Sequence, residues 1–306
     1  MNQHSVCAGV VAHNPVNGDV NVLIESLLVS SKWVVIVDNN SSDKRYLEGL
    51  VNHPSVRIIC NNDNRGVSGG INQIIDYARH VKADFLAAFD HDTKISLDLV
   101  DALASNLERL LATGEAVAAI GPLVIDDYTN HTLPFIQFRL PLNTRYSLEQ
   151  SPESDRLVEC DFLISSGCLM SMKAIDDIGS MNEALFIDNV DLDWCFRASH
   201  KKYKVYGDFG SVIRQQIGSA YTQIPFTKAV IRYHDYNRIY YMTRNRVWLY
   251  RQQYVNRSWV VHDVCRLTCK FLYLLLFKRD RTVLLRRSVK GIIDSFAMRP
   301  YNSPSH

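Results

Sequence analysis

The sequence predicts an α/β fold in which helices cover a mostly parallel central sheet. Short apolar runs alternate with longer stretches of helical periodicity over the first two thirds of the chain, as expected when strands and helices follow one another. The 306 residues include 34 Lys plus Arg, 32 Asp plus Glu and 47% hydrophobic residues. This composition excludes an intrinsically disordered chain, and the length suffices for one large domain or a main domain with an appendage.

The predicted strands are apolar runs bounded by polar or glycine residues. In chain order they are Cys7 to Ala12, Trp33 to Val37, Val56 to Cys60, Asp84 to Phe89 and Ala118 to Ile125. The polar stretch from Asn143 to Arg156 interrupts the alternation after them, and it predicts a mobile loop over a site or between subdomains.

Helices are predicted between these strands. The best defined covers residues 97 to 111, where leucines recur at helical spacing, Ser96 is a candidate N-cap and Gly114 follows the end. A second helix follows the glycine-rich segment 64 to 72, and its apolar side is formed by residues between 71 and 81. Both helices are expected to pack on the sheet.

Polar side chains follow three of the predicted strands at the point where each strand ends. His13 and Asn14 follow the first strand, Asp38 follows the second, and Asp90 and Asp92 follow the fourth. Because the carboxyl ends of parallel strands meet at one edge of a sheet, and ligands bind there, these residues are candidates for a binding site. For the second strand end, the structural alternative is an Asx turn, in which the side chain of Asp38 or Asn39 hydrogen-bonds to the backbone that follows it.

Asp90 and Asp92 form the most explicit chemical pattern in the sequence. Two carboxylates spaced by one residue at a strand end can both reach a hard divalent cation, so the pattern predicts Mg²⁺ or Mn²⁺ bound through oxygen. A solvated turn is the alternative for this spacing, and His91 between them is expected to point outward in a structural role. A cation held here would neutralise a diphosphate leaving group.

A second acidic cluster lies in the segment 186 to 197, at the predicted start of a helix. Asp188 as an N-cap, and Asp193 paired with Arg197 four residues later, would have ordinary structural roles. Asp191 has no such role. A carboxylate beside a bound sugar can take a proton from an incoming hydroxyl, so Asp191 is a candidate general base.

Seven motifs follow one another over about residues 7 to 251: VVAHNP, VIVDNNSSD, NNDNRGVSGGINQ, FDHDT, FLISSGCLMS, FIDNVDLDWCFRA and YYMTRNR. Together they resemble the family 2 glycosyltransferases, and most closely the rhamnosyltransferases that build bacterial surface polysaccharides such as O-antigen. The resemblance implies a nucleotide-diphospho-sugar-binding (GT-A type) fold and a single inverting displacement with a divalent metal. It favours dTDP-L-rhamnose as the donor, with a UDP-hexose as the alternative, and a lipid-linked saccharide as the acceptor.

The resemblance also assigns roles to individual residues. Asp38 matches the family's nucleobase-contacting aspartate, and Asp191 matches the proposed general base. Asp90 and Asp92 match the metal and diphosphate motif. The other donor-binding candidates are His13, Asn14, Arg65, Asn72, Ser166 and Gly167, and the other acceptor or phosphate candidates are Asp188, Trp194, His234 and Arg244.

The chain departs from the family pattern in two places. Val190 stands where many relatives have Glu, so the assignment of the base rests on one carboxylate fewer. Gln215 and Gln216 precede Ile-Gly where close relatives carry His, which leaves His234 or an arginine of the segment 240 to 246 to contact a metal or phosphate.

Two other classes of protein fit the sequence less well. A nucleotidyltransferase usually has a basic, glycine-rich triphosphate loop near its N-terminus, and residues 8 to 20 contain no Lys or Arg. A non-catalytic module that binds nucleic acid or a membrane surface would leave the acidic strand ends without a purpose. We therefore expect an enzyme with no nucleic-acid partner.

The charge is divided unevenly along the chain. Residues 1 to 223 hold 18 basic and 28 acidic residues, whereas residues 224 to 306 hold 16 and 4. We expect a catalytic nucleotide-sugar-binding domain over residues 1 to 223, and a basic helical region over residues 224 to 306 that contacts the acceptor, a membrane or another subunit.

Within the basic region, the apolar run 271 to 277 is flanked by Lys and Arg. It is far shorter than the about 20 residues that span a bilayer, so it is expected to lie among lipid headgroups as a peripheral attachment. A buried helix or a subunit interface is the alternative.

The seven cysteines are scattered and odd in number, which favours a reducing compartment, and the first residues do not form a signal-peptide pattern. The expected location is therefore the cytoplasmic face of a membrane.

Overall fold

The computed structural model describes residues 5–16, 18–148, 156–216, 220–223, 230–233, 236–277 and 281–301. Its central feature is a nine-stranded sheet. Eight strands follow the order β3-β2-β1-β4-β10-β6-β11-β5, and the ninth, β9, pairs with β11. The strands are β1 (Val6–Ala12), β2 (Trp33–Asp38), β3 (Val56–Cys60), β4 (Phe85–Asp90), β5 (Lys94–Ile95), β6 (Val117–Asp126), β9 (Leu157–Cys160), β10 (Cys168–Ser171) and β11 (Lys204–Gln215).

The half of the sheet around β1 is parallel throughout. β1 pairs in parallel with β2 and β4, and β2 pairs in parallel with β3. β10 then enters between β4 and β6 and runs antiparallel to both, and β11 returns to a parallel pairing with β6. The predicted α/β fold with a mostly parallel central sheet is confirmed, and each predicted strand lies within one residue of its predicted ends.

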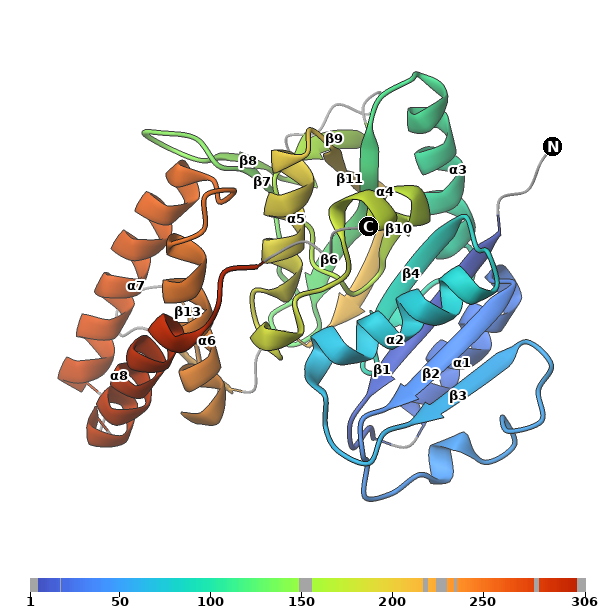
Figure 1. The fold of residues 1–306 in the computed structure, drawn as a ribbon, viewed down its shortest axis with the longest axis horizontal. Coiled ribbons are helices and arrows are strands. Elements are labelled where there is room, and N and C mark those ends of the chain that lie inside the picture. The colour runs from blue at the N-terminus through green and yellow to red at the C-terminus, as the bar shows by residue number, and fades with distance from the viewer. Residues whose placement is uncertain are drawn as a thin grey trace.

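Helices cover both faces of this sheet (Figure 1). The helices are α1 (Asp19–Ser30), α2 (Gly66–His80), α3 (Leu99–Ala112), α4 (Met172–Ile178), α5 (Val190–His200), α6 (Tyr236–Tyr250), α7 (Arg257–Phe277) and α8 (Arg281–Ala297). Buried side chains of α1 and α3 form one apolar core with the sheet, and those of α2, α4 and α5 form a second core on the other face. The sheet is therefore buried on both sides, as a parallel sheet requires.

Two local predictions were wrong. Helix α3 begins at Leu99 after Asp98, so Ser96 is not its N-cap, although Gly114 does follow the helix with a positive φ of 85°. The polar stretch from residue 143 contains β8 (Thr144–Tyr146), which pairs with β7 (Phe135–Gln137) as a hairpin. Residues 149–155 of that stretch lie outside the described part of the chain.

The C-terminal region is helical, as predicted. Helices α6, α7 and α8 gather at one end of the molecule, on the far side of α5 from the β1–β3 strands, and the chain after α8 returns toward α5 (Figure 1). There the Tyr301 hydroxyl donates to the carbonyl of Ser180, and the Arg197 guanidinium lies 4.1 Å from the Tyr301 ring centre. The predicted boundary after residue 223 falls between β12 (Ala220–Gln223) and β13 (Val230–Tyr233), which form one hairpin.

Helix α8 packs on α6 through a face of small residues. Ser288, Gly291 and Ser295 are buried there, and a Cβ atom placed on Gly291 would lie 2.8 Å from the carbonyl oxygen of Tyr240. Glycine is therefore required for the two backbones to approach this closely. Among the described helices, none is both long enough and apolar enough to cross a membrane.

Candidate active site

A cavity of about 560 Å³ opens at the carboxyl edge of the parallel strands. Ala12 pairs with Asp38 and Val11 pairs with Asp90, so the ends of β1, β2 and β4 lie level and their polar extensions meet. The cavity is lined by His13, Asn39, Asp90, Asp92, Asp191 and Gln215, among others. The predicted convergence of these strand ends is therefore observed.

Asp90 and Asp92 present their carboxylates to this cavity. Within the described residues, neither carboxylate has a hydrogen-bond or ion-pair partner, and His91 lines the cavity between them instead of pointing away from it. Burial, together with the negative charges of Asp92 and Asp191, raises the pKa of Asp90 to about 7 against the opposing effect of Arg238. Such a site gains stability from a cation, because a bound cation would offset the repulsion between the carboxylates.

The donor set limits which cation fits. The described residues contain no cluster of three or more His, Cys, Asp or Glu side chains that could enclose a metal ion. Two carboxylates with open oxygens suit Mg²⁺ or Mn²⁺, which keep several waters and are completed by the phosphates of a substrate. Gln215 and Gln216, which stand where the family resemblance implies a His, both line the same cavity.

Asp191 lies in the first turn of α5 and also faces the cavity. Its Oδ1 accepts a hydrogen bond of 2.8 Å from the backbone N–H of Leu192. Burial raises the pKa of Asp191 to about 6, although that bond and a backbone contact from Ser165 lower it. A carboxylate with this pKa is largely ionised at neutral pH and is a stronger base than an exposed aspartate.

The loop before α5 has an unusual backbone conformation. Phe186, Asp188 and Asn189 all have positive φ angles, between 62° and 65°. Residues other than glycine adopt this region at a cost, and clusters of such residues occur where the backbone is held for function. The Nδ2 atom of Asn189 is buried and has no hydrogen-bond partner in the described structure. Asn189 lines the cavity, and its unsatisfied amide N–H adds to the energetic cost of this loop conformation.

Helix α6 holds this strained loop in place. The side-chain amide of Asn245 lies within 2.9 Å of the carbonyl oxygens of Leu185, Ile187 and Asp188. The Arg244 guanidinium donates to the carbonyl of Leu185 at 3.0 Å. These contacts offset the backbone strain, and they place Arg244 behind the loop instead of at the cavity.

An ion pair closes one side of the cavity. Arg238 lies 3.1–3.2 Å from both carboxylate oxygens of Asp188. Asp188 was predicted as the N-cap of α5, but the N-cap position is held by Asn189, and the Asp188 carboxylate faces Arg238 instead. Arg238 remains 40% exposed and lines the cavity, so its other N–H groups can reach an anionic ligand.

Three of the residues predicted to contact the nucleotide lie at the carboxyl ends of β1 and β2. His13 lines the cavity and contacts the carbonyl of Asn39, and Asn14 bonds to the loop after β2 through Ser41 and Ser42. Asp38 is fully buried. Burial tends to raise the pKa of Asp38, but hydrogen bonds from Ser41, Tyr46 and Lys44 outweigh that effect and hold the pKa below its ordinary value. Asp38 therefore supports the loop, and Asn39 lines the cavity.

Arg65 and Asn72 contact protein instead of lining the cavity. Both bond to Glu183, and Asn72 also exchanges hydrogen bonds with the backbone of Met181. They fasten α2 to the segment that leads into the strained loop. Between them, Gly66 has a φ of 71°, and a Cβ atom there would lie 2.3 Å from the carbonyl oxygen of Phe186.

The segment 165 to 167 lies beneath Asp90. The Ser166 hydroxyl is 1% exposed and accepts from the backbone N–H of Asp90 at 3.1 Å, and the backbone N–H of Gly167 donates to Ala88. Ser165 lines the cavity beside them. Ser166 and Gly167 thus fix the end of β4 and with it the position of the acidic pair.

One further candidate, Trp194, and its neighbour Asp193 do not line the cavity. Trp194 is 2% exposed, and its indole N–H donates to the carbonyl of Gly179 at 3.0 Å. Asp193 is buried and forms the predicted ion pair with Arg197, and it also accepts from the Tyr254 hydroxyl. Both residues are structural. His234 lies outside the described residues.

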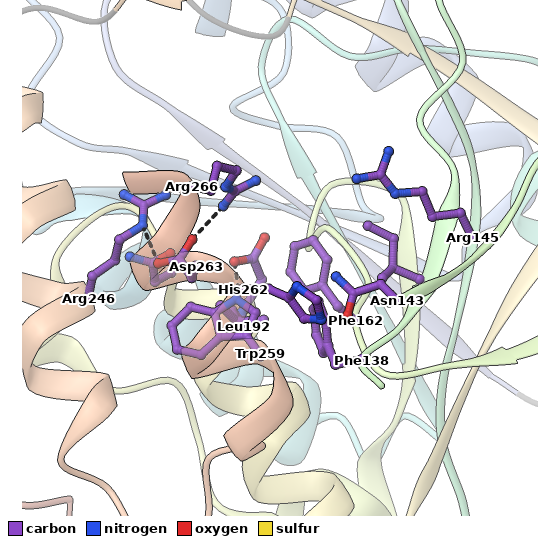
Figure 2. Close-up of a pocket in the computed structure, with 13 residues that line it drawn as sticks. Phe138, Asn143, Arg145, Phe162, Leu192, Arg246, Trp259, His262, Asp263 and Arg266 are labelled. Carbon is purple, nitrogen blue, oxygen red and sulfur yellow. Dashed lines mark hydrogen bonds and ion pairs between the residues drawn. The ribbon is translucent and has the colours of Figure 1, made fainter. Parts of the chain in front are cut away.

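A second cavity of about 490 Å³ adjoins the first and shares Asn189, Asp191 and Arg246 with it. It lies between the β7–β8 hairpin on one side and α6 and α7 on the other (Figure 2). Asp191 therefore stands at the junction of two cavities.

Asn189, Arg238 and Arg246 line these cavities and were not individually predicted as site residues. Their segments were visible in the sequence, since Asn189 lies in the second acidic cluster and Arg246 ends the motif YYMTRNR. The choice among neighbouring residues depends on positive φ angles and long-range ion pairs, which have no local signature.

Residues 7–179 match the profile of Glycosyl transferase family 2. The chain is 24% identical over 290 residues to the dTDP-rhamnosyl transferase RfbF of Shigella flexneri, and the match covers 95% of each protein.

Two solved structures share the fold. The structure of GalNAc-T7 with UDP, GalNAc and Mn²⁺ matches with a TM-score of 0.57 and 12% identity, over 83% of this chain and 49% of the other. The structure of TarS from S. aureus matches with a TM-score of 0.53 and 13% identity, over 90% of this chain and 44% of the other. The chain thus spans about half the length of these two proteins.

Proposed function

Because the chain belongs to glycosyl transferase family 2 and is a glycosyltransferase, we propose that it transfers L-rhamnose from dTDP-L-rhamnose to a saccharide acceptor. In this proposal the acceptor is a lipid-linked saccharide of a bacterial surface polysaccharide. The transfer inverts the configuration of the anomeric carbon and uses Mg²⁺ or Mn²⁺. The donor and the sugar are suggested by the Shigella flexneri relative, which matches over nearly the whole chain. A UDP-hexose is the second candidate donor, favoured by the UDP in the GalNAc-T7 structure.

One observation carries the inverting mechanism. The acidic pair Asp90 and Asp92 lies in one cavity, and Asp191 lies where that cavity meets a second one. A single displacement needs a leaving group and an incoming hydroxyl on opposite sides of the anomeric carbon. Two adjoining cavities with a carboxylate at their junction supply that arrangement.

Asp191 acts as the general base in this proposal. The acceptor hydroxyl loses its proton to the Asp191 carboxylate as its oxygen forms the bond to the anomeric carbon, and the bond from that carbon to the diphosphate oxygen breaks at the same time. Asn189 lines the same junction beside Asp191. Positioning both substrates in this way removes much of the entropic part of the barrier.

The leaving group needs positive charge. Asp90 and Asp92 would hold the divalent cation, which when bound supplies electrostatic stabilisation of the departing diphosphate. Arg238 adds a fixed cation on the same cavity wall. Neither group takes part in a covalent step.

The direct test is nucleotide release from a panel of dTDP- and UDP-sugars, measured with Mn²⁺ or Mg²⁺ and with EDTA. The proposal expects turnover that depends on both the sugar and the cation, with dTDP-L-rhamnose preferred. The melting temperature should rise most with the matching nucleoside diphosphate in the presence of Mn²⁺. Release from a nucleoside triphosphate instead would indicate a nucleotidyltransferase.

The rate should depend on pH through Asp191. Because the base is active only when ionised, kcat should fall by about tenfold per pH unit once the pH drops below the pKa of about 6, and it should level off above it. Steady-state rates between pH 4.5 and 8.5 under saturating donor would measure this limb. A rate that stays constant from pH 7 to pH 5 would contradict the assignment.

We also propose that the protein attaches to the cytoplasmic face of a membrane, and α8 is the surface that supports this. Besides Val283, its exposed apolar residues are Leu285, Val289, Ile292, Ile293 and Phe296. Their spacing of 4, 7, 8 and 11 residues places them on one side of the helix, which we call the α8 stripe. Arg286 and Lys290 lie on the helix beside it. An apolar stripe bordered by basic side chains suits a surface of anionic lipid. Of the run 271 to 277 that the sequence suggested, Leu272 is exposed, and the side chains of residues 274–277 are outside the description.

Flotation with liposomes tests the α8 stripe. The chain should float with vesicles that contain anionic phosphatidylglycerol, and less so with neutral phosphatidylcholine or in high salt. The double variant Ile293→Gln and Phe296→Gln should lose most of this recovery, whereas Val29→Gln, an equally exposed apolar position on α1, should not. Equal recovery with both lipids, or none with either, would contradict the proposal, and a loss of dimers in the double variant would identify the stripe as a subunit interface.

A further inference from the structure

The second cavity carries an inference about the acceptor, and this inference rests on the proposed function. If the donor occupies the first cavity, a hydroxyl that reaches Asp191 from the other side must come from the second cavity, because both share that carboxylate. The second cavity has a volume of about 490 Å³, within the range of small-ligand sites. Its lining therefore reports the chemistry of the acceptor.

One wall of the second cavity is apolar. Phe138, Phe162 and Trp259 line it together with Ile136 and Leu192. Phe162 is only partly buried and lies beside Phe138 (Figure 2). Flat aromatic and aliphatic surfaces of this kind pack against the apolar C–H faces of a sugar ring.

The polar part of the lining is mostly cationic. Arg246 and Arg266 both pair with Asp263, at 3.0 and 2.5 Å, as the dashed lines in Figure 2 indicate. Asp263 is 2% exposed and also accepts from the Tyr250 hydroxyl at 2.7 Å. One carboxylate thus offsets two guanidinium groups, and the cluster keeps one net positive charge.

Arg145 adds a second positive charge from the opposite side. It lies on the β7–β8 hairpin, across the cavity from Arg266 (Figure 2). Arg145 has no hydrogen-bond or ion-pair partner within the described residues, and Arg266 is 71% exposed with one guanidinium nitrogen engaged. His262, between them, uses Nε2 as a donor to the carbonyl of Arg139 at 2.8 Å. Away from Asp191, the lining therefore carries an excess of positive charge and open N–H donors.

We propose that the second cavity binds the acceptor saccharide and selects one that carries an anionic group, held between Arg145 and Arg266 while the sugar ring packs on Phe162. A neutral sugar offers these two guanidinium groups only uncharged hydroxyl and ether oxygens, whereas a phosphate or carboxylate accepts stronger, charge-assisted hydrogen bonds from both. Phosphate and carboxylate share this chemistry, and the experiment below separates them.

The experiment uses the full chain and three matched sets of saccharides: methyl glycosides of common hexoses, the corresponding hexose 1-phosphates and the corresponding uronic acids. Binding of each is measured by NMR without a donor, and acceptor use is measured as nucleoside diphosphate release above the rate without acceptor. Anionic members should bind at least about tenfold more tightly than neutral ones, as expected for a charge-assisted hydrogen bond. The set that binds better, phosphates or uronic acids, identifies the source of the charge.

Variants assign this selectivity to the cavity. Arg145→Gln and Arg266→Gln should each weaken binding of anionic members by about tenfold, and raise the acceptor KM more than the donor KM. The matched control is Arg109→Gln, because Arg109 is an exposed arginine on α3 that bonds only to Asn106 among described residues, and it should change neither. Equal binding of neutral and anionic members by the wild type, or variants that weaken both alike, would overturn the inference. Failure to release nucleotide from any nucleotide sugar would count against the proposed function instead, and the donor-free binding result would stand on its own.

Discussion

Replacing Asp191 by Asn is expected to lower kcat by about 10²-fold or more while the donor KM stays close to its wild-type value. Loss of a positioned general base has an effect of this size. Asn keeps the shape of the side chain and its contact with the Leu192 backbone region, but it cannot accept the proton of the acceptor hydroxyl. Initial rates with saturating donor and acceptor would measure the loss.

The same variant should not lose stability, which separates a catalytic from a structural role. Burial raises the pKa of Asp191, so ionised Asp191 opposes folding at any pH above its unfolded pKa of about 4. The melting temperature of Asp191→Asn should therefore equal or exceed that of the wild type at pH 7. Asp193→Asn is the contrast, because Asp193 is paired with Arg197 and Tyr254 and its replacement should lower the melting temperature. A collapse of donor affinity in Asp191→Asn would make Asp191 a binding residue.

The variant Asp92→Asn is expected to reduce cation-dependent turnover by about 10²-fold or more with the fold intact. An amide is a poor ligand for a hard cation, and stabilisation of a developing charge by a metal contributes several kcal/mol. Asp92 is exposed and has no described partner, so its replacement removes no structural contact. Rates measured over a Mn²⁺ titration would show a higher concentration at half-maximal activity.

Asp101→Asn provides a matched control, since Asp101 is an exposed aspartate on α3 that does not line the cavity. It should retain full activity and the wild-type Mn²⁺ dependence. Full activity of Asp92→Asn, or a loss that does not vary with Mn²⁺, would reject the assignment of Asp92 to the cation.

Much of the fold could be predicted because its signals are local. Strand ends follow from apolar runs that stop at polar residues, as at Ala12, Asp38 and Asp90, and parallel topology then brings these ends together. The ion pair of Asp193 with Arg197 follows from helical spacing alone. The N-cap of α3 was harder to predict from the sequence, because Ser96 and Asp98 are both residue types that favour a helix start and only the backbone conformation decides between them.

The depth of a side chain was harder to predict than its position along the chain. Asp38 has the sequence context of a ligand-binding residue, yet Tyr46 and Lys44 satisfy it beneath the cavity. Asp188 resembles a helix cap, and Arg238, fifty residues later, determines its actual role. The second cavity could not be predicted either, since its lining comes from a hairpin in the middle of the chain and from helices at its end.

The close contact at Gly291 links the outer surface of the molecule to its reacting centre. Side chains usually absorb small displacements between helices, but here the backbone of α8 lies directly against that of α6, which leaves little room for the two helices to shift relative to each other. Asn245 of α6 is bonded to the three carbonyls that fix the loop before Asp191. Whatever holds α8 therefore also restrains the orientation of Asp191, the proposed general base, and an enzyme seated through α8 would present its proposed acceptor cavity at a constant height and angle above the surface that carries it.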